Sequence, residues 1–161
     1  MEAKSWATTA GTRRSMRSNR GRDTKPEIAV RRLVHAQGLR YRVSARPEPD
    51  LRRTADLLFT RARVAVFIDG CYWHGCPVHY TAPVANGRFW AEKVARNRER
   101  DGETTAVLKS RDWTVLHFWE HESAHLVADE IVATVRNRRT VELGSARRAT
   151  KAGEVTRTDQ S

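Results

Sequence analysis

The stretch from Val64 to His79 constrains the fold of this chain more than any other. It begins with an apolar run rich in β-branched residues, which predicts a buried strand, and the pair Asp69-Gly70 ends that strand. Both cysteines of the chain, two histidines and a Tyr-Trp pair follow directly. Because a sheet fixes the backbone while the loop after a strand presents side chains, this segment predicts a functional site at the end of a strand.

The surrounding pattern predicts a single α/β domain. The runs 55–59 and 63–68 are apolar and are joined by a short link, which predicts a β-hairpin. The run 113–119 is almost continuously apolar, which predicts a strand buried on both faces. A Thr-Lys-Pro-Glu sequence at 24–27 predicts the start of a helix, in which Glu27 completes a capping box.

Helical segments follow the cysteines. Residues 88–100 predict one helix that ends near Gly102, residues 103–109 predict a second, and residues 123–135 keep the apolar spacing of a third. The first segment carries a stripe of polar and aromatic side chains at three- and four-residue steps, unlike a core face. The members of that stripe are Trp90, Lys93, Asn97 and Asp101.

Charge predicts the kind of partner. The 161 residues contain 30 Lys and Arg against 19 Asp and Glu, a net charge of +11 that is typical of a protein bound to a polyanion, with nucleic acid as the leading candidate. A merely solvated basic surface is the alternative. The absence of an apolar run that spans a bilayer predicts a soluble protein of the bacterial cytoplasm, near the nucleoid and without a membrane partner.

Two basic flanks enclose the predicted domain at 23–136. Residues 1–22 are short of aliphatic side chains and contain five arginines, which predicts a flexible arm that closes around nucleic acid or a plain disordered tail. Residues 137–161 are polar, basic and aperiodic, which predicts a disordered tail.

Four soft or borderline ligands predict a possible zinc site. They are Cys71, Cys76, His79 and His121. Their spacing is irregular for a zinc finger, so buried thiols near satisfied histidines are the alternative. With all four positions filled by protein, a zinc ion there is expected to be structural.

A second set of residues suits metal-assisted cleavage of a phosphodiester. Asp56 and Asp69 lie at the ends of adjacent predicted strands, and His74 follows within a few residues. Carboxylates hold a divalent cation, while a histidine near neutral pKa activates water. The alternatives are a strand-end Asp56 that faces water, an Asp69 that serves the turn before Gly70, and a His74 that is a spectator.

Five segments carry motifs in a defined order. They are Thr24-Lys25-Pro26-Glu27; Ala55-Asp56 with Phe59; Val66 to His79; Phe89-Trp90 with Lys93, Asn97 and Arg100-Asp101; and Trp119-Glu120-His121-Glu122. In this order they resemble the very short patch repair (Vsr-type) DNA mismatch endonucleases, and the resemblance extends over approximately residues 15 to 122.

The resemblance implies an enzyme that recognises a T:G mismatch, the product of 5-methylcytosine deamination, and nicks the strand 5′ of the mispaired T to start very short patch repair. It implies a fold like that of type II restriction endonucleases, with a central mixed β-sheet flanked by helices, catalytic Mg²⁺ and structural Zn²⁺. The expected partners are mismatched double-stranded DNA, mismatch-repair proteins and a repair polymerase, and the enzyme is expected to be a monomer. The alternatives are a zinc-stabilised DNA-binding module without catalysis and a restriction-type endonuclease that cuts matched DNA.

The resemblance also implies roles for individual residues. Asp56 is the implied Mg²⁺ ligand together with the main-chain carbonyl of Ile68, and His74 serves the attacking water. Glu27 and Asp101 are implied to bind metal-bound waters or to orient the site. The implied zinc ligands are Cys71, Cys76, His79 and His121. The implied DNA contacts are Arg17, Tyr72, Trp73, Trp90, Lys93 and Asn97.

Two aspartates compete for the metal position. Asp50 follows a proline, as the metal ligand of the family usually does, whereas Asp56 follows Ala55. We choose Asp56, because its distance to Asp69 and the phenylalanine three residues later fit the family pattern. Asp50 is followed by Leu-Arg-Arg, a poor strand.

The aromatic residues Tyr72, Trp73 and Trp90 permit two interpretations. Aromatic side chains near a strand end or on a helix usually fill the core, and truncating one there costs about 3–5 kcal/mol. We expect instead exposed rings that insert beside a mismatch, because the first two lie in a loop and Trp90 lies on a polar stripe.

Overall fold

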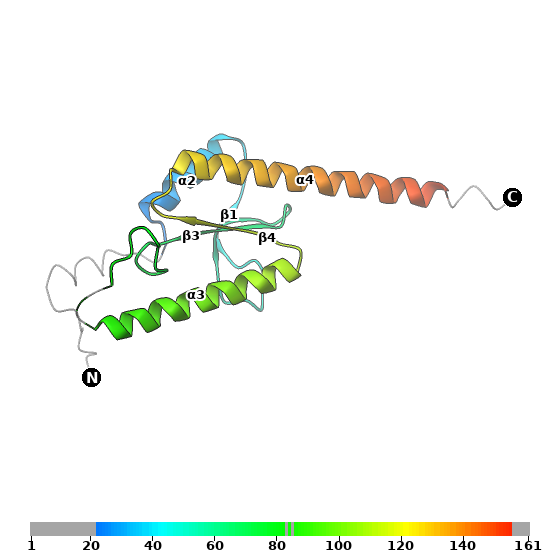
Figure 1. Cartoon of the computed structure of the whole chain (residues 1–161). Coiled ribbons are helices and arrows are strands. Elements are labelled where there is room, and N and C mark those ends of the chain that lie inside the picture. The colour runs from blue at the N-terminus through cyan, green and yellow to red at the C-terminus, as the bar shows by residue number, and fades with distance from the viewer. Residues whose placement is uncertain (1–21, 83, 85, 156–161) are drawn as a thin grey trace.

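A four-stranded sheet lies at the centre of the protein (Figure 1). The computed structural model describes residues 22–82, 84 and 86–155. Strand order is β1-β2-β3-β4; the first three strands are antiparallel neighbours, and β4 runs parallel to β3. The strands are β1 Arg42–Ala45, β2 Ala55–Phe59, β3 Val64–Asp69 and β4 Thr114–Trp119. This confirms the expected single α/β domain with a mixed sheet.

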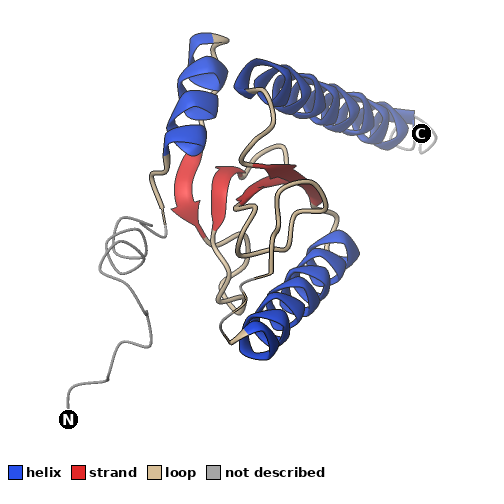
Figure 2. Ribbon diagram, turned by 60° about the vertical axis from the view of Figure 1, so that its left-hand side comes forward, coloured by secondary structure: helices blue, strands red, loops and turns tan. Residues whose placement is uncertain are grey.

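Three helices in the described residues complete the fold: α2 Lys25–Ala36, α3 Gly87–Ser110 and α4 Ala124–Val155. Helices α2 and α4 pack together on one face of the sheet, while α3 lies across the other face (Figures 1 and 2). The described part of the chain has no helix that is both long and apolar enough to cross a membrane.

Successive side chains along each strand point to opposite faces of the sheet, so the core is divided into two layers. On one face Leu57, Phe59 and Val66 pack with residues of α2 and α4. On the other face Leu58 and Phe67 belong to a smaller cluster that includes Leu108 of α3. The predicted hairpin is confirmed by the antiparallel pairing of β2 with β3.

The structure differs from the sequence analysis in three elements. Helix α3 is continuous, because Gly102 is exposed and a glycine inside a helix costs only about 1 kcal/mol relative to alanine. Strand β4 is half-buried rather than buried on both faces, since it forms one edge of the sheet. Helix α4 runs on to Val155, through residues 137–155 that composition predicted to be disordered; this stretch contains four Arg and three Ala, which favour helix.

Topology brings the candidate residues to one end of the sheet. The antiparallel β2 begins where β3 ends, and the parallel β4 ends beside β3, with Asp69 opposite Trp119. Asp56 at the start of β2, the loop after β3 and the loop after β4 therefore meet at the same edge.

Candidate active site

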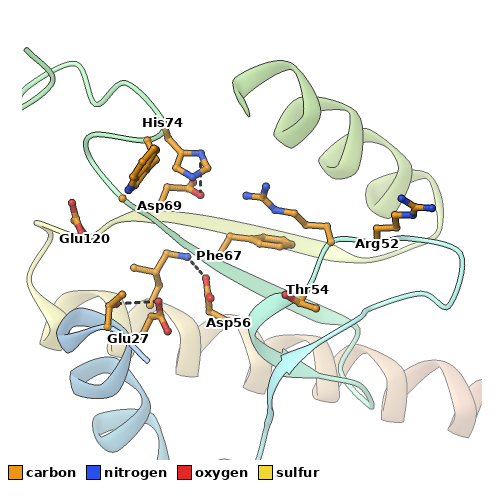
Figure 3. Close-up of a pocket in the computed structure, with 13 residues that line it drawn as sticks. Glu27, Arg52, Thr54, Asp56, Phe67, Asp69, His74 and Glu120 are labelled. Atoms are coloured by element: carbon orange, nitrogen blue, oxygen red, sulfur yellow. Dashed lines mark hydrogen bonds and ion pairs between the residues drawn. The ribbon is translucent and has the colours of Figure 1, made fainter. Parts of the chain in front are cut away.

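A cleft of about 540 Å³ opens at this edge of the sheet (Figure 3). Its walls are strands β2 and β3, the loop before β2, the loops after β3 and β4, and the start of α2. Its lining consists of Thr24, Glu27, Arg52, Arg53, Thr54, Asp56, Phe67, Ile68, Asp69, Gly70, Trp73, His74 and Glu120. The cleft thus unites carboxylates, an imidazole and two guanidinium groups from four separate parts of the chain.

Asp56 is the most perturbed carboxylate of the cleft. Its Oδ2 accepts a hydrogen bond from the backbone N–H of Ile68 at 2.7 Å, where β2 and β3 separate (Figure 3). The pKa of Asp56 is raised to about 6, chiefly by burial and also by the nearby carboxylates of Glu27 and Asp69, against the lowering effects of the Ile68 N–H and of the Arg31 charge. A carboxylate in such surroundings gains from a bound cation, because the cation offsets both the burial and the repulsion.

His74 is held in place by carboxylates on two elements. Its Nδ1 lies 2.6 Å from Asp101 Oδ2 on α3 and 3.7 Å from Asp69 Oδ1 at the end of β3. Burial raises the pKa of Asp101, but the hydrogen bond with His74 and the charge of Arg53 outweigh that effect and keep the pKa below its ordinary value. An imidazole that is held through Nδ1 by carboxylates retains Nε2 as the nitrogen that can accept a proton.

Arg53 supplies a cation beside these carboxylates. Its Nη2 lies 2.7 Å from Asp101 Oδ1 without hydrogen-bond alignment, and its guanidinium lies 5.8 Å from the centre of the Phe67 ring. The side chain therefore forms an ion pair and a ring contact at the cleft wall.

Glu27 is fixed by hydrogen bonds at the start of α2. Its carboxylate accepts hydrogen bonds from the Asp23 N–H at 2.7 Å, the Thr24 hydroxyl at 3.0 Å and Arg31 Nη2 at 3.0 Å. The predicted capping box is not formed, since the Thr24 side chain makes no hydrogen bond to the helix N-terminus and Glu27 accepts from the N–H of Asp23 rather than of Thr24. Glu27 is only 5% exposed and lines the cleft with Asp56.

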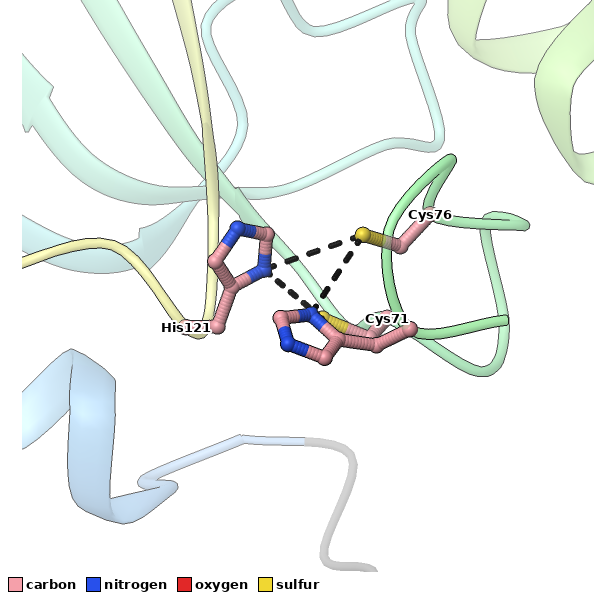
Figure 4. Close-up of side chains that lie close together, drawn as sticks. Cys71, Cys76 and His121 are labelled. Atoms are coloured by element: carbon pink, nitrogen blue, oxygen red, sulfur yellow. Dashed lines mark hydrogen bonds between the residues drawn. The ribbon is translucent and has the colours of Figure 1, made fainter. Parts of the chain in front are cut away.

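A second cluster joins the loop after β3 to His121, which follows β4 (Figure 4). The ligand atoms of Cys71, Cys76, His79 and His121 all lie within 4.8 Å of one another. Both cysteines are free thiols, and burial, reinforced by the neighbouring Cys76, raises the pKa of Cys71 to about 11. Without a cation this thiol stays protonated at neutral pH.

The spacing of the cluster fits a tetrahedral ion. Zinc–sulfur bonds of about 2.3 Å and zinc–nitrogen bonds of about 2.0–2.1 Å at tetrahedral angles place sulfur and nitrogen about 3.6 Å apart. The four distances between a cysteine Sγ and a histidine Nδ1 range from 3.1 Å to 3.9 Å. The parallel pairing of β3 with β4 produces this geometry, because it brings the loop of the cysteines next to His121.

The aromatic residues form one cluster rather than separate exposed rings. Tyr72 and Trp90 lie 5.2 Å apart between ring centroids, and Trp73 lies 5.6 Å from Trp90. Lys93 Nζ lies 5.0 Å and 5.3 Å from the two tryptophan rings, and Asn97 donates a hydrogen bond to the carbonyl of Trp73 at 2.9 Å. The cluster thus joins α3 to the loop after β3.

The expectation that all three rings are exposed is wrong for Trp90. This side chain is 3% exposed, whereas Tyr72 and Trp73 are half-buried. A helical wheel cannot show that the loop after β3 folds back over the polar stripe and covers its first member. Trp73, which also lines the cleft, is the ring that remains accessible beside the candidate catalytic residues.

Replacing Trp90 by alanine is therefore expected to reduce the free energy of unfolding by about 3–5 kcal/mol, since a large buried ring leaves a cavity. Trp73→Ala, at a half-buried position, is the matched control and is expected to cost less. Urea denaturation followed by circular dichroism measures both. Equal stability of Trp90→Ala and the unaltered protein would contradict the packing role.

Several residues of the site were not found by sequence reasoning. His117 of β4 has Nδ1 2.7 Å from Asp69 Oδ2, and Glu120 accepts a hydrogen bond from the Cys71 N–H at 2.8 Å. The available signal was the alternation of β4, where a histidine interrupts an apolar strand.

Asp50, the rejected alternative to Asp56, lies away from the cleft and pairs with Arg111 at 2.7 Å on the surface. Arg17 lies outside the described residues.

Comparison with known proteins identifies relatives along most of the chain. Residues 7–80 match the family model of the DNA mismatch endonuclease Vsr. The chain is 40% identical over 130 residues to the type II nicking enzyme V.NaeI of Lentzea aerocolonigenes, which covers 80% of this chain and 78% of the relative. It is 32% identical over 108 residues to the DNA mismatch endonuclease Vsr of Escherichia coli K12. This alignment covers 66% of this chain and 67% of the relative.

The mixed sheet, the cleft and these similarities together define an endonuclease of the α/β class. The chain belongs to the Vsr endonuclease family.

Proposed function

We propose that this protein is a magnesium-dependent endonuclease that recognises a T:G mismatch in double-stranded DNA and nicks the strand 5′ of the mispaired T. The observation that carries the proposal is the cleft that unites the buried carboxylate of Asp56 with His74. The E. coli relative is a DNA mismatch endonuclease and the L. aerocolonigenes relative is a nicking enzyme, which supports the same activity here.

Asp56 and the main-chain carbonyl of Ile68 would hold the magnesium ion, because Mg²⁺ prefers carboxylate and carbonyl oxygens. When bound, the ion stabilises the negative charge that develops on the phosphate during hydrolysis. Glu27 and Asp69 add negative charge around this position, and their repulsion of Asp56 favours a cation there. Glu27, through its hydrogen bonds to Asp23 and Thr24, would fix the start of α2 at the cleft wall.

His74 is the proposed proton acceptor. Asp101 binds Nδ1, so the free Nε2 takes a proton from the water that attacks phosphorus. The bond between phosphorus and the 3′ oxygen breaks. The 3′ oxygen takes a proton and leaves as a hydroxyl group, and a 5′-phosphate remains on the other fragment for resynthesis. Arg53, which pairs with Asp101, adds positive charge at the wall that a DNA phosphate approaches.

The cysteine and histidine cluster is proposed to hold structural zinc. Four protein ligands leave no position for water or substrate, so the ion would join the loop after β3 to the loop after β4. The loop after β3 carries both His74 and Trp73, so the ion would stabilise the cleft without taking part in cleavage.

Recognition of the mismatch is proposed to use the half-buried rings of Tyr72 and Trp73, with Trp90 as their buried support. Insertion of a ring between base pairs costs a few kcal/mol of unstacking, and a mismatch lowers that cost because it has already weakened the stack. Lys93, which lies over both tryptophan rings, would bring positive charge to the same place.

Incubation with end-labelled duplexes that each contain a single mismatch tests this proposal. Nicking of the T strand of the T:G duplex, with Mg²⁺ and not without it, is the expected result. Double-strand breaks on fully paired DNA would instead assign a restriction-type activity. Tight mismatch binding without cleavage at any magnesium concentration would assign a DNA-binding module.

A further inference from the structure

We propose that His117 is a positioning residue of the nicking centre, which holds the Asp69 carboxylate toward His74. The proposal rests on the nicking activity proposed above and goes beyond it, since it adds a histidine to the site. It is carried by the contacts that His117 makes with three residues, Asp69 and Phe67 of β3 and Thr105 of α3.

Asp69 lies between two imidazoles. Its Oδ2 is 2.7 Å from His117 Nδ1, and its Oδ1 is 3.7 Å from His74 Nδ1. The short contact fixes the carboxylate plane, and the second oxygen is thereby directed at the histidine that serves the attacking water. Without His117 the carboxylate would be free to rotate about its side-chain bonds.

His117 is itself fixed on both sides. Its Nε2 lies 3.0 Å from the Thr105 hydroxyl of α3, and its ring stacks on Phe67 with centroids 5.0 Å apart and planes 16° from parallel. Because both ring nitrogens have partners, the imidazole has no free nitrogen to offer to DNA. This arrangement suits a residue that acts through Asp69 rather than on the substrate.

The contact between Thr105 and His117 also joins α3 to the sheet. The buried residues of this helix are Trp90, Val94 and Leu108. Between the last two, the polar side chains Asn97, Asp101 and Thr105 follow at four-residue steps and reach Trp73, His74 and His117 respectively. Thr105 and His117 thus complete a row of polar contacts that orients the centre.

Two substitutions separate the contact with Asp69 from packing. The amide nitrogen of Asn occupies the place of the imidazole Nδ1, so His117→Asn keeps a donor for Asp69 and loses the stacking. His117→Phe keeps an aromatic ring over Phe67 and loses the donor. His117→Gln places its amide nitrogen toward Thr105 rather than Asp69, and it stands in if the Phe variant does not fold.

Single-turnover nicking of the T:G duplex, with DNA affinity measured separately and melting temperature recorded for each variant, tests the role. We expect His117→Phe and His117→Gln to lower the single-turnover rate about 10- to 100-fold at unchanged DNA affinity, and His117→Asn to retain most of the rate. Thr105→Val, which leaves the Asp69 contact in place, is expected to have a smaller effect.

Three results would overturn the role of His117: an unaltered rate in His117→Phe or His117→Gln, an equal loss in His117→Asn, or a loss confined to DNA affinity. The unaltered protein is assayed in parallel. If it does not nick any duplex, the proposed function fails. If it nicks while the Phe and Gln variants nick equally fast, only the positioning role fails.

Discussion

Asp56→Asn is expected to abolish nicking while it leaves binding to mismatched DNA largely intact. The substitution removes the negative charge that would hold magnesium, and it leaves the aromatic cluster and the basic surface unchanged. A loss of at least about 10³-fold in the nicking rate is expected, given the several kcal/mol that a bound metal contributes to charge stabilisation. Gel-based nicking and a separate binding assay measure the two effects.

Asp50→Asn is the matched control. This aspartate is exposed and pairs with Arg111, away from the cleft, and surface ion pairs contribute about 0–1 kcal/mol. It should nick at the rate of the unaltered protein. An Asp50→Asn variant that does not nick, together with an Asp56→Asn variant that does, would show that the wrong aspartate was assigned as the magnesium ligand.

The same Asp56 substitution should raise stability in buffer without magnesium. The pKa of Asp56 is about 6 in the folded protein and 3.8 in the unfolded chain, so the folded state binds more protons between these values. Stability therefore falls as pH rises from about 4 to about 6, and the full penalty of up to about 3 kcal/mol persists at pH 8. Asp56→Asn lacks this penalty and keeps an oxygen for the Ile68 N–H.

Denaturation at pH 8 and near pH 3 checks the direction of this effect. The Asn variant should be more stable at pH 8, and the difference should vanish near pH 3, below both pKa values, where Asp56 is protonated in both states. Addition of magnesium should stabilise the unaltered protein and not the variant. A variant that is less stable at pH 8 would contradict the burial of an uncompensated charge.

His121→Ala is expected to release zinc and to lower the melting temperature and the yield of folded protein. A structural metal contributes its binding free energy to folding, and His121 is the ligand that links the two loops across the sheet edge. Mass spectrometry of metals should find one zinc per chain in the unaltered protein, purified without chelator, and less in the variant. His125→Ala, an exposed histidine on α4, is the control and should retain both zinc and stability. Zinc-free unaltered protein, or equal melting temperatures, would contradict the zinc assignment.

The local features of this protein could be predicted from the sequence. The hairpin of β2 and β3, the strand that ends at Asp69 and the start of α2 depend on side-chain alternation, turn residues and a proline in the first helical turn. These signals act over a few residues. The motif order was likewise sufficient to indicate the family that the comparisons show.

Contacts across the layers were decided by the tertiary structure alone. Trp90 is buried because the loop after β3 folds over α3, and His117 reaches Asp69 because β4 pairs in parallel with β3. Neither fact follows from periodicity, since burial and pairing depend on segments far apart in the chain. The sequence by itself determined which chemistry the chain carries and at which strand ends it lies. Only the tertiary structure decided which aromatic ring stays accessible, through the packing of α3, and which histidines share the Asp69 carboxylate, through the pairing of β3 with β4, because these distances are set by the whole core.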